Sequence, residues 1–291
     1  MPMFFSFLAY LGVALLLTAL LYFPVFQLVS IFWEVRPDRF FYRLAMIIAI
    51  IGFWPFLRWR ELHQRDALGY APATRDFLKI FSRGVAIGIL ILLFTAVLLL
   101  TFGARIPVPG LLRYGDLAAA LFTGMLSGIL VALIEETFFR GALQTGMRRH
   151  SSLLTTVICI NLLYAALHFT RPPISPDSTA VDWQSGWTML TGMLHQFGDF
   201  GNIADSFAAL FVAGLLLSLI RENTGNIALC AGIHAGWVLT IRVTREVTDA
   251  AHDAPSAWMI GSYDNITGWA ATAVLGLLTA WYWHYRYRKH R

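Results

Sequence analysis

Charge is scarce in this sequence. Asp, Glu, Lys and Arg make up 13% of its 291 residues, whereas roughly a quarter of a soluble domain is charged. Cysteine is scarce too: Cys159 and Cys230 are the only two and both lie inside apolar stretches, which excludes a disulfide framework and a cysteine-based zinc site. Hydrophobic residues dominate instead, at 57% of the chain with a mean hydropathy of +0.62. This composition excludes a soluble globular protein and indicates a chain that lies in a lipid bilayer.

Eight stretches without Asp, Glu, Lys or Arg are candidate membrane spans, because a bilayer core about 30 Å thick is crossed by roughly 20 apolar residues of helix. They are 1–33, 44–57, 84–104, 117–134, 151–170, 206–220, 223–241 and 265–285. The second is short unless the aromatic residues at its ends extend it. We therefore predict an all-α polytopic membrane protein with about eight transmembrane helices, in which residues 1–291 form a single transmembrane domain.

The basic residues are explained by this topology. There are 22 lysines and arginines against 17 acidic residues, a net charge of +5, and such an excess can mark a nucleic-acid-binding protein. Here the basic residues sit in short clusters between the apolar stretches, and most fall on one face if both termini are cytoplasmic, as the positive-inside rule favours. We expect an integral protein of the plasma (inner) membrane, with the bilayer as its surroundings and no nucleic-acid partner. The loop 171–205 would then lie outside, where Trp183 and Trp187 predict an interfacial segment.

The fourth apolar stretch ends in ionisable residues, in the sequence EETFFRG at 135–141. Ionisable side chains at bilayer depth are costly and are usually retained for a task or paired internally. On a helix, Glu136 and Arg140 are i,i+4 neighbours and can form an ion pair, while Glu135 points about 100° away and is left without that partner. One carboxylate can thus be structural and the other reactive. The alternative is a helix end at which these side chains simply reach water.

Two histidines in other spans favour a functional site. His168 lies in the fifth stretch and His234 in the seventh. Counting along the helices places Glu135 and His168 at similar depth on adjacent antiparallel spans, with His234 on a helix that enters from the same face. Each histidine alone is typical of a hydrogen-bonded packing residue. Their convergence with an acidic pair predicts one polar site inside the membrane.

This set of residues is suited to peptide hydrolysis, which needs an activated water, a stabilised oxyanion and a proton donor for the leaving amine. Glu135 would be the general base, His168 would hold the water, and His234 would donate a hydrogen bond to the carbonyl oxygen. A zinc ion held by Glu135, His168 and His234, with the remaining carboxylate as base, is the alternative mechanism. The sequence does not separate the two. It contains no Gly-x-Ser-x-Gly elbow and no Asp pair within the spans, so serine and aspartyl proteolysis find no support.

The motifs also resemble a known family. EETFFR at 135–140, Tyr164 followed four residues later by His168, and His234 in a later span occur in the order seen in the CPBP family, which comprises the type 2 CAAX prenyl proteases and the bacteriocin-processing (Abi) proteins. The resemblance covers about residues 115–242, which it marks as a catalytic core within the membrane.

The resemblance implies an intramembrane protease of about eight helices. In that family Glu135 would be the catalytic carboxylate, Glu136 and Arg140 would organise it, and His168 and His234 would complete the site. It further implies that the substrate is a membrane protein or a lipidated peptide, cut near the bilayer surface.

The sequence departs from the family pattern at two positions. Tyr164 stands where Phe is usual, and Val238 stands four residues after His234, where the family commonly has Asn or Asp. If that polar residue supplies an oxyanion donor, its loss can cost about 10²- to 10³-fold in rate. Asn161 could substitute for it, although an interhelical hydrogen bond is the simpler interpretation of that residue.

The leading hypothesis is therefore an intramembrane endopeptidase. Val238 favours one alternative, a non-catalytic scaffold, immunity or maturation factor with the same fold. A proton- or cation-coupled transporter that uses the buried Glu and His residues is the other.

Overall fold

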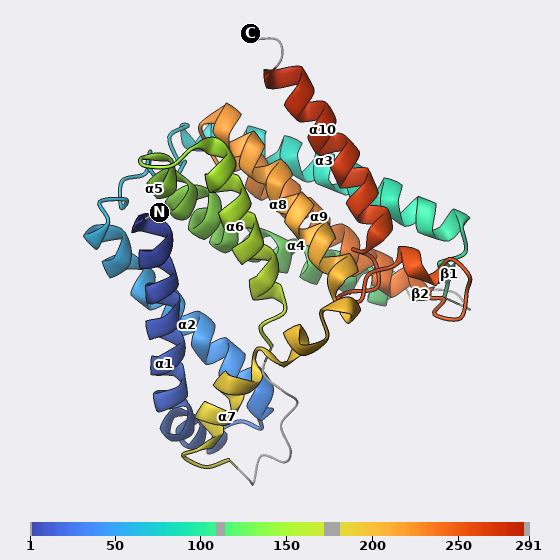
Figure 1. The fold of residues 1–291 in the computed structure, drawn as a ribbon. Helices are drawn as coiled ribbons and strands as arrows, with labels where there is room; N and C mark the ends of the chain where they lie inside the picture. The colour runs from blue at the N-terminus through green and yellow to red at the C-terminus, as the bar shows by residue number, and fades with distance from the viewer. Residues whose placement is uncertain (1, 109–113, 172–180, 288–291) are drawn as a thin grey trace. The chain divides into compact units, whose positions relative to one another are not determined.

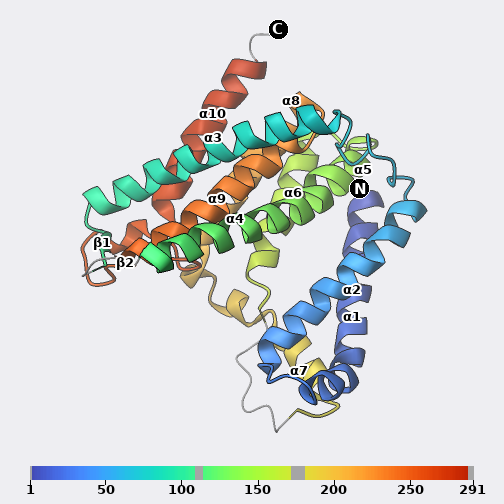
Figure 2. The same cartoon turned by 180° about the vertical axis from the view of Figure 1, so that it is seen from behind.

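The computed structural model describes residues 2–108, 114–171 and 181–287, which are mainly helical (Figures 1 and 2). The helices are α1 (Pro2–Ser30), α2 (Pro37–Trp59), α3 (Thr74–Thr101), α4 (Tyr114–Glu136), α5 (Gln144–Arg148), α6 (Leu153–His168), α7 (Ser185–Gly192), α8 (Ala204–Thr224), α9 (Ala228–Val247) and α10 (Trp269–Tyr287). A π-helical segment, η1 (Thr137–Leu143), joins α4 to α5, and η3 (His195–Asn202) and η4 (Ala257–Met259) are 3-10 helices. Two short strands are β1 (Arg105–Pro107) and β2 (Thr248–Ala250).

Each of the eight predicted apolar stretches overlaps a helix, and the all-α fold class is confirmed. Five helical runs in the described parts of the chain are long and apolar enough to cross a membrane: α1, α2, α3, α8 and the run Asp116–Arg148. The number eight is not confirmed. α6 has only 16 residues, and α9 carries Arg242, Arg245 and Glu246 near its end. The short second stretch becomes a helix of 23 residues because its flanking aromatic residues join it.

The chain divides into two compact units, Met1–His63 with Ala166–Gly201, and Gln64–Ala165 with Asn202–Arg291, called unit 1 and unit 2 below. The expectation of one transmembrane domain stays a prediction. In unit 1, α1 packs against α2 and α7 around an aromatic core, and the Tyr22 hydroxyl donates to the Pro37 carbonyl at 3.1 Å. Trp183 and Trp187 are exposed, and their place at the membrane interface stays a prediction. Residues 172–180 of the predicted outer loop lie outside the described residues.

In unit 2, α9 lies between α3 and α4, and α8 packs on α10 (Figures 1 and 2). Glycines allow α3 and α9 to approach closely. A Cβ atom on Gly232 would collide with the Phe81 carbonyl oxygen, and one on Gly88 would collide with that of Ile233. On the other side of α9, a Cβ on Gly128 would come within 2.8 Å of the Ala235 carbonyl oxygen. This backbone contact, which is typical of helix pairs in membranes, sets the rotation of α9.

The strands join the ends of α3 and α9. β1 and β2 are antiparallel, with Arg105 opposite Ala250. The Arg105 side chain is buried and donates from Nε to the Thr248 hydroxyl at 2.7 Å and from Nη1 to the Asn265 carbonyl at 2.8 Å. One guanidinium thus holds the segment before α10 to the strand pair.

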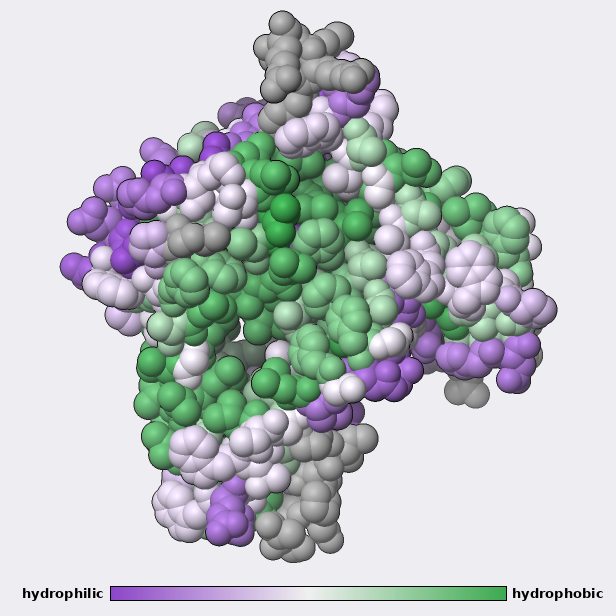
Figure 3. All heavy atoms as spheres, viewed as in Figure 1, coloured by the Kyte–Doolittle hydropathy of each residue, from purple (hydrophilic) through white to green (hydrophobic). Residues whose placement is uncertain are grey.

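The surface of unit 2 is apolar where the helices are exposed. In the view of Figure 3, hydrophobic side chains cover α6, and hydrophilic ones gather near α5. Exposed apolar residues follow one another at helical spacing on α6 at Leu154, Ile158 and Leu162. Such faces are typical of helices in contact with lipid.

The close approach of α3 and α9 generates a prediction. Gly232→Ala should destabilise the protein by about 1–3 kcal/mol, because the new methyl group would overlap a backbone carbonyl and force the helices apart. Gly276→Ala on α10 is the matched control: nothing lies within 4 Å of a Cβ there, so alanine should be neutral or stabilising by up to about 1 kcal/mol. Thermal unfolding in detergent micelles measures both. Equal melting temperatures for the two variants would contradict the packing described here.

Candidate active site

The acidic pair lies where α4 changes into a π-helix. Glu135 and Glu136 are the last residues of α4, and the i+5 hydrogen bond from the Gln144 amide to the Phe139 carbonyl marks the wider turn that follows. The sequence had predicted an ordinary α-helix here, and the structure corrects this. Insertions of this kind are rare and occur often at functional sites. The wider turn changes the direction of every side chain beyond it.

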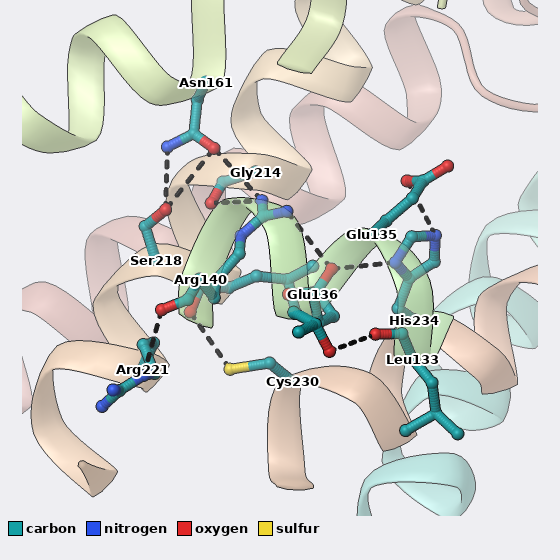
Figure 4. Close-up of polar contacts among 12 residues, drawn as sticks. Leu133, Glu135, Glu136, Arg140, Asn161, Gly214, Ser218, Arg221, Cys230 and His234 are labelled. Atoms are coloured by element: carbon teal, nitrogen blue, oxygen red, sulfur yellow. Dashed lines mark hydrogen bonds and ion pairs between the residues drawn. The ribbon is translucent and has the colours of Figure 1, made fainter. Parts of the chain in front are cut away.

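Glu136 is the centre of a buried ion cluster. Its Oε1 accepts hydrogen bonds from Arg140 Nη1 at 3.2 Å and from His234 Nδ1 at 2.9 Å, so the predicted i,i+4 ion pair is present (Figure 4). The side chains of Glu136 and Arg140 are 0% exposed. Because an ionised carboxylate only accepts hydrogen bonds, the proton of the His234 ring lies on Nδ1. This leaves Nε2 directed away from Glu136.

Arg140 extends the cluster to two further helices. Its Nη2 donates to Asn161 Oδ1 on α6 at 3.1 Å and to the Gly214 carbonyl on α8 at 3.2 Å. The guanidinium also lies over the Tyr164 ring, 4.7 Å from its centroid, in the arrangement of a cation–π contact. Asn161 Nδ2 in turn donates to Ser218 at 3.0 Å. One buried arginine therefore holds η1, α6 and α8 together.

Glu136 pairs with both Arg140 and His234, whereas the ion-pair partner of Glu135 among the described residues is the His234 imidazole. The Glu135 side chain is 28% exposed, and its Oε2 lies 3.9 Å from His234 Nε2, too far for a direct hydrogen bond (Figure 4). Among the described residues, this buried oxygen has no hydrogen-bond partner at all. The two carboxylates differ in their surroundings: Glu136 is fully buried and bonded to Arg140 and His234 through Oε1, and Glu135 is partly exposed beside the second imidazole nitrogen. The reactive role of Glu135 stays a prediction.

His168 is the last residue of α6, one helical turn after Tyr164. It is grouped with unit 1, and its part in the site stays a prediction. Val238 packs against Gly128 of α4, whose Cβ would lie 3.4 Å from it. Asn161 uses both amide hydrogens, on the Val157 carbonyl and on Ser218. Its role is the interhelical hydrogen bond, and it does not supply the donor that Val238 lacks.

The zinc alternative has limited support in unit 2. Across the parts of the chain that the structure describes, no three His, Cys, Asp or Glu side chains are grouped to hold a metal ion. Glu136 and His234 Nδ1 are bonded to one another, which leaves Glu135 and His234 Nε2 as donors. These two do not make up a zinc ligand set by themselves. The predicted set of Glu135, His168 and His234 stays a prediction.

Two residues of the cluster were missed from the sequence, Gly214 and Ser218 on α8. The Gly214 carbonyl bonds Arg140, and its Cα lies so close to Asn161 that a Cβ would overlap the amide. Ser218 is buried and bonds Asn161. Their small-x-x-x-small spacing in an apolar span is a signal of close helix packing and could have drawn attention to both.

The comparisons with known proteins support this assignment of the region. Residues 117–240 match the family model of the Rce1-like type II CAAX prenyl endopeptidases. The matched segment contains every residue of the cluster and His168, and it confirms the resemblance found from the motifs. The comparisons with curated proteins and with solved structures give no match.

The ion cluster generates a second prediction. Arg140→Met should destabilise the protein by about 3–5 kcal/mol, because the Glu136 carboxylate would stay buried without its guanidinium partner. Arg148→Met is the control, since its ion pair with Glu222 is partly exposed, at 34% and 25%, and should contribute at most about 1 kcal/mol. Chemical unfolding in micelles gives both values, and a similar loss in both variants would show that the buried pair has no special role.

Proposed function

Because residues 117–240 match the type II CAAX prenyl endopeptidase family, we propose that this protein is an intramembrane endopeptidase whose general base is Glu135. The substrate class we propose is a membrane-associated or lipidated protein. One observation carries the proposal: the Glu135 side chain is 28% exposed and its Oε2 lies 3.9 Å from His234 Nε2, whereas Glu136 is fully buried and bonded to Arg140 and His234.

The chemistry follows from these positions. Glu135 takes a proton from a water molecule, and the resulting hydroxide attacks the carbonyl carbon of the scissile bond. Protonated at Nε2, His234 donates a hydrogen bond to the oxyanion, while Nδ1 stays bonded to Glu136. Glu135 then delivers its proton to the leaving amine, and the C–N bond breaks to give an amine and a carboxylic acid, which afterwards loses its proton to solvent. When both carboxylates are ionised and His234 is doubly protonated, the net charge is zero over the four side chains Glu135, Glu136, Arg140 and His234.

His168 supplies the second contact to the attacking water in this proposal, as the family resemblance implies. The oxyanion would have one side-chain donor fewer than in relatives with Asn or Asp at the position of Val238. That same substitution favours the second candidate function, a scaffold or maturation factor that keeps the fold without the chemistry. The two candidates differ in whether Glu135 is needed for peptide hydrolysis.

Glu135→Gln tests the general base. The purified protein in liposomes should cleave a quenched fluorescent peptide that ends in a prenylated Cys-a-a-X sequence, and the variant should be slower by about 10²- to 10⁴-fold because glutamine cannot accept the proton. Glu222→Gln is the matched control, since it removes a carboxylate bonded to Arg148 at the end of α8 and should leave the rate unchanged.

Each other outcome counts against a defined part of the proposal. Equal rates for wild-type protein and Glu135→Gln would exclude Glu135 as the base. Failure of the wild-type protein to cut the peptide with or without its prenyl group would contradict the endopeptidase and favour the scaffold. Glu135-dependent ion flux without peptide products would favour the transporter.

The choice between the glutamate and zinc mechanisms has its own test. Since Glu136 and His234 Nδ1 are already bonded to one another, we propose the glutamate mechanism and expect cleavage to survive dialysis against a chelator. Metal analysis of the purified protein before and after dialysis is the accompanying measurement. One zinc per chain, lost together with activity and restored by added zinc, would support the metal mechanism instead.

A further inference from the structure

A short loop ahead of α3 contacts two elements of the site, η1 and the start of α9. This loop, residues 66–70, touches the π-helical segment at two points. The Tyr70 hydroxyl is 2.7 Å from the Thr137 hydroxyl, and the Leu68 carbonyl lies against Gly141, where a Cβ would come within 2.9 Å of it. The loop also reaches the start of α9, because the Gly69 carbonyl accepts a hydrogen bond from the Ile227 amide at 3.1 Å.

The loop is fitted to these contacts. Gly69 has a φ of +81°, which favours glycine, and a Cβ there would lie 2.9 Å from the Ile227 side chain. The Tyr70 ring stacks on Phe77 of α3, with ring centroids 5.4 Å apart and an interplanar angle of 22°. The backbone of the loop and the stacked ring of Phe77 therefore both fix the position of the Tyr70 hydroxyl.

The direction of the hydrogen bonds can be assigned. The Thr137 hydroxyl donates its only hydrogen to the Leu133 carbonyl, so the Tyr70 hydroxyl is the donor to Thr137. Burial raises the pKa of the Tyr70 phenol, which keeps that proton in place at neutral pH. The resulting chain of hydrogen bonds runs from Tyr70 through Thr137 to Leu133, and it spans the three residues between Leu133 and Thr137, which include Glu135 and Glu136 (Figure 4 shows Leu133 beside Glu136).

We propose that Tyr70 is a positioning residue of the proteolytic site, whose hydroxyl holds the junction between α4 and η1 in the register that directs Glu135 toward His234. The inference rests on the proposed function. The physical reason is that a π-helix competes with the commoner α-helix, and a register change of one residue rotates side chains by about 100°. Tyr70 contacts neither Glu135 nor the scissile bond, so its effect passes through Thr137.

Tyr70→Phe is the central test, because it keeps the stacked ring and removes only the hydroxyl. We expect kcat on the prenylated peptide to fall about 10-fold or more with little change in KM, since a displacement of 1 Å can cost about 10²-fold. Hydrogen exchange of the amides of 137–143 should become faster, and this readout needs no substrate. Tyr22→Phe is the matched control: it removes a buried hydroxyl bonded to a carbonyl in unit 1 and should change neither quantity.

Changes at Thr137 test whether the effect passes through this hydroxyl. Thr137→Val should reproduce Tyr70→Phe, while Thr137→Ser keeps the hydroxyl and should retain the wild-type kcat. The double variant Tyr70→Phe, Thr137→Val should be no slower than Thr137→Val alone, because the two changes break one chain of bonds.

Two outcomes would overturn the inference. One is a Tyr70→Phe protein with wild-type kcat and wild-type exchange at 137–143. The other is a lower melting temperature with unchanged kcat, which would make the hydroxyl a structural contact only. If Glu135→Gln proves fully active, the proposed function fails instead, and the exchange measurement still decides whether Tyr70 holds the junction.

Discussion

The Glu136 carboxylate lies fully buried between a guanidinium and an imidazole, inside a group of helices whose outer faces are apolar. A charge in such surroundings is tolerated only when its partners are close and well directed. Arg140 meets this need, and its second terminal nitrogen, Nη2, requires acceptors of its own, which Asn161 and the Gly214 carbonyl provide. The arrangement of η1, α6, α8 and α9 around this pair follows from that requirement, and it places Glu135 beside His234.

Backbone contact makes the arrangement rigid. Glycines let α9 lie directly against the backbones of α3 on one side and α4 on the other. In a bilayer, where lipid offers no hydrophobic force between helices, such close packing is a main source of helix association. The side chain of His234 is therefore held by the packing of a whole helix, and the loop 66–70 adds a polar attachment at the start of α9 and at η1.

The different surroundings of the two glutamates would allow the proposed general base to coexist with a buried ion pair. Glu136 is bonded to Arg140 and His234 through Oε1 and is fully buried, while Glu135 is partly exposed beside the second imidazole nitrogen. Val238 is one of the two positions at which this chain departs from the family pattern, and it packs on Gly128 at the contact of α4 and α9. The hydrogen bond between Glu136 and His234 does not involve Val238.

Local pattern was sufficient for much of this molecule. The apolar stretches predicted the helices, and the i,i+4 spacing of Glu136 and Arg140 predicted their ion pair, because both depend on residues close together in the chain. The roles of Gly214 and Ser218 and the contact of Tyr70 with Thr137 were decided by tertiary structure. Each of these depends on groups from distant parts of the chain meeting at one place, and periodicity within a single segment carries no information about which segments become neighbours.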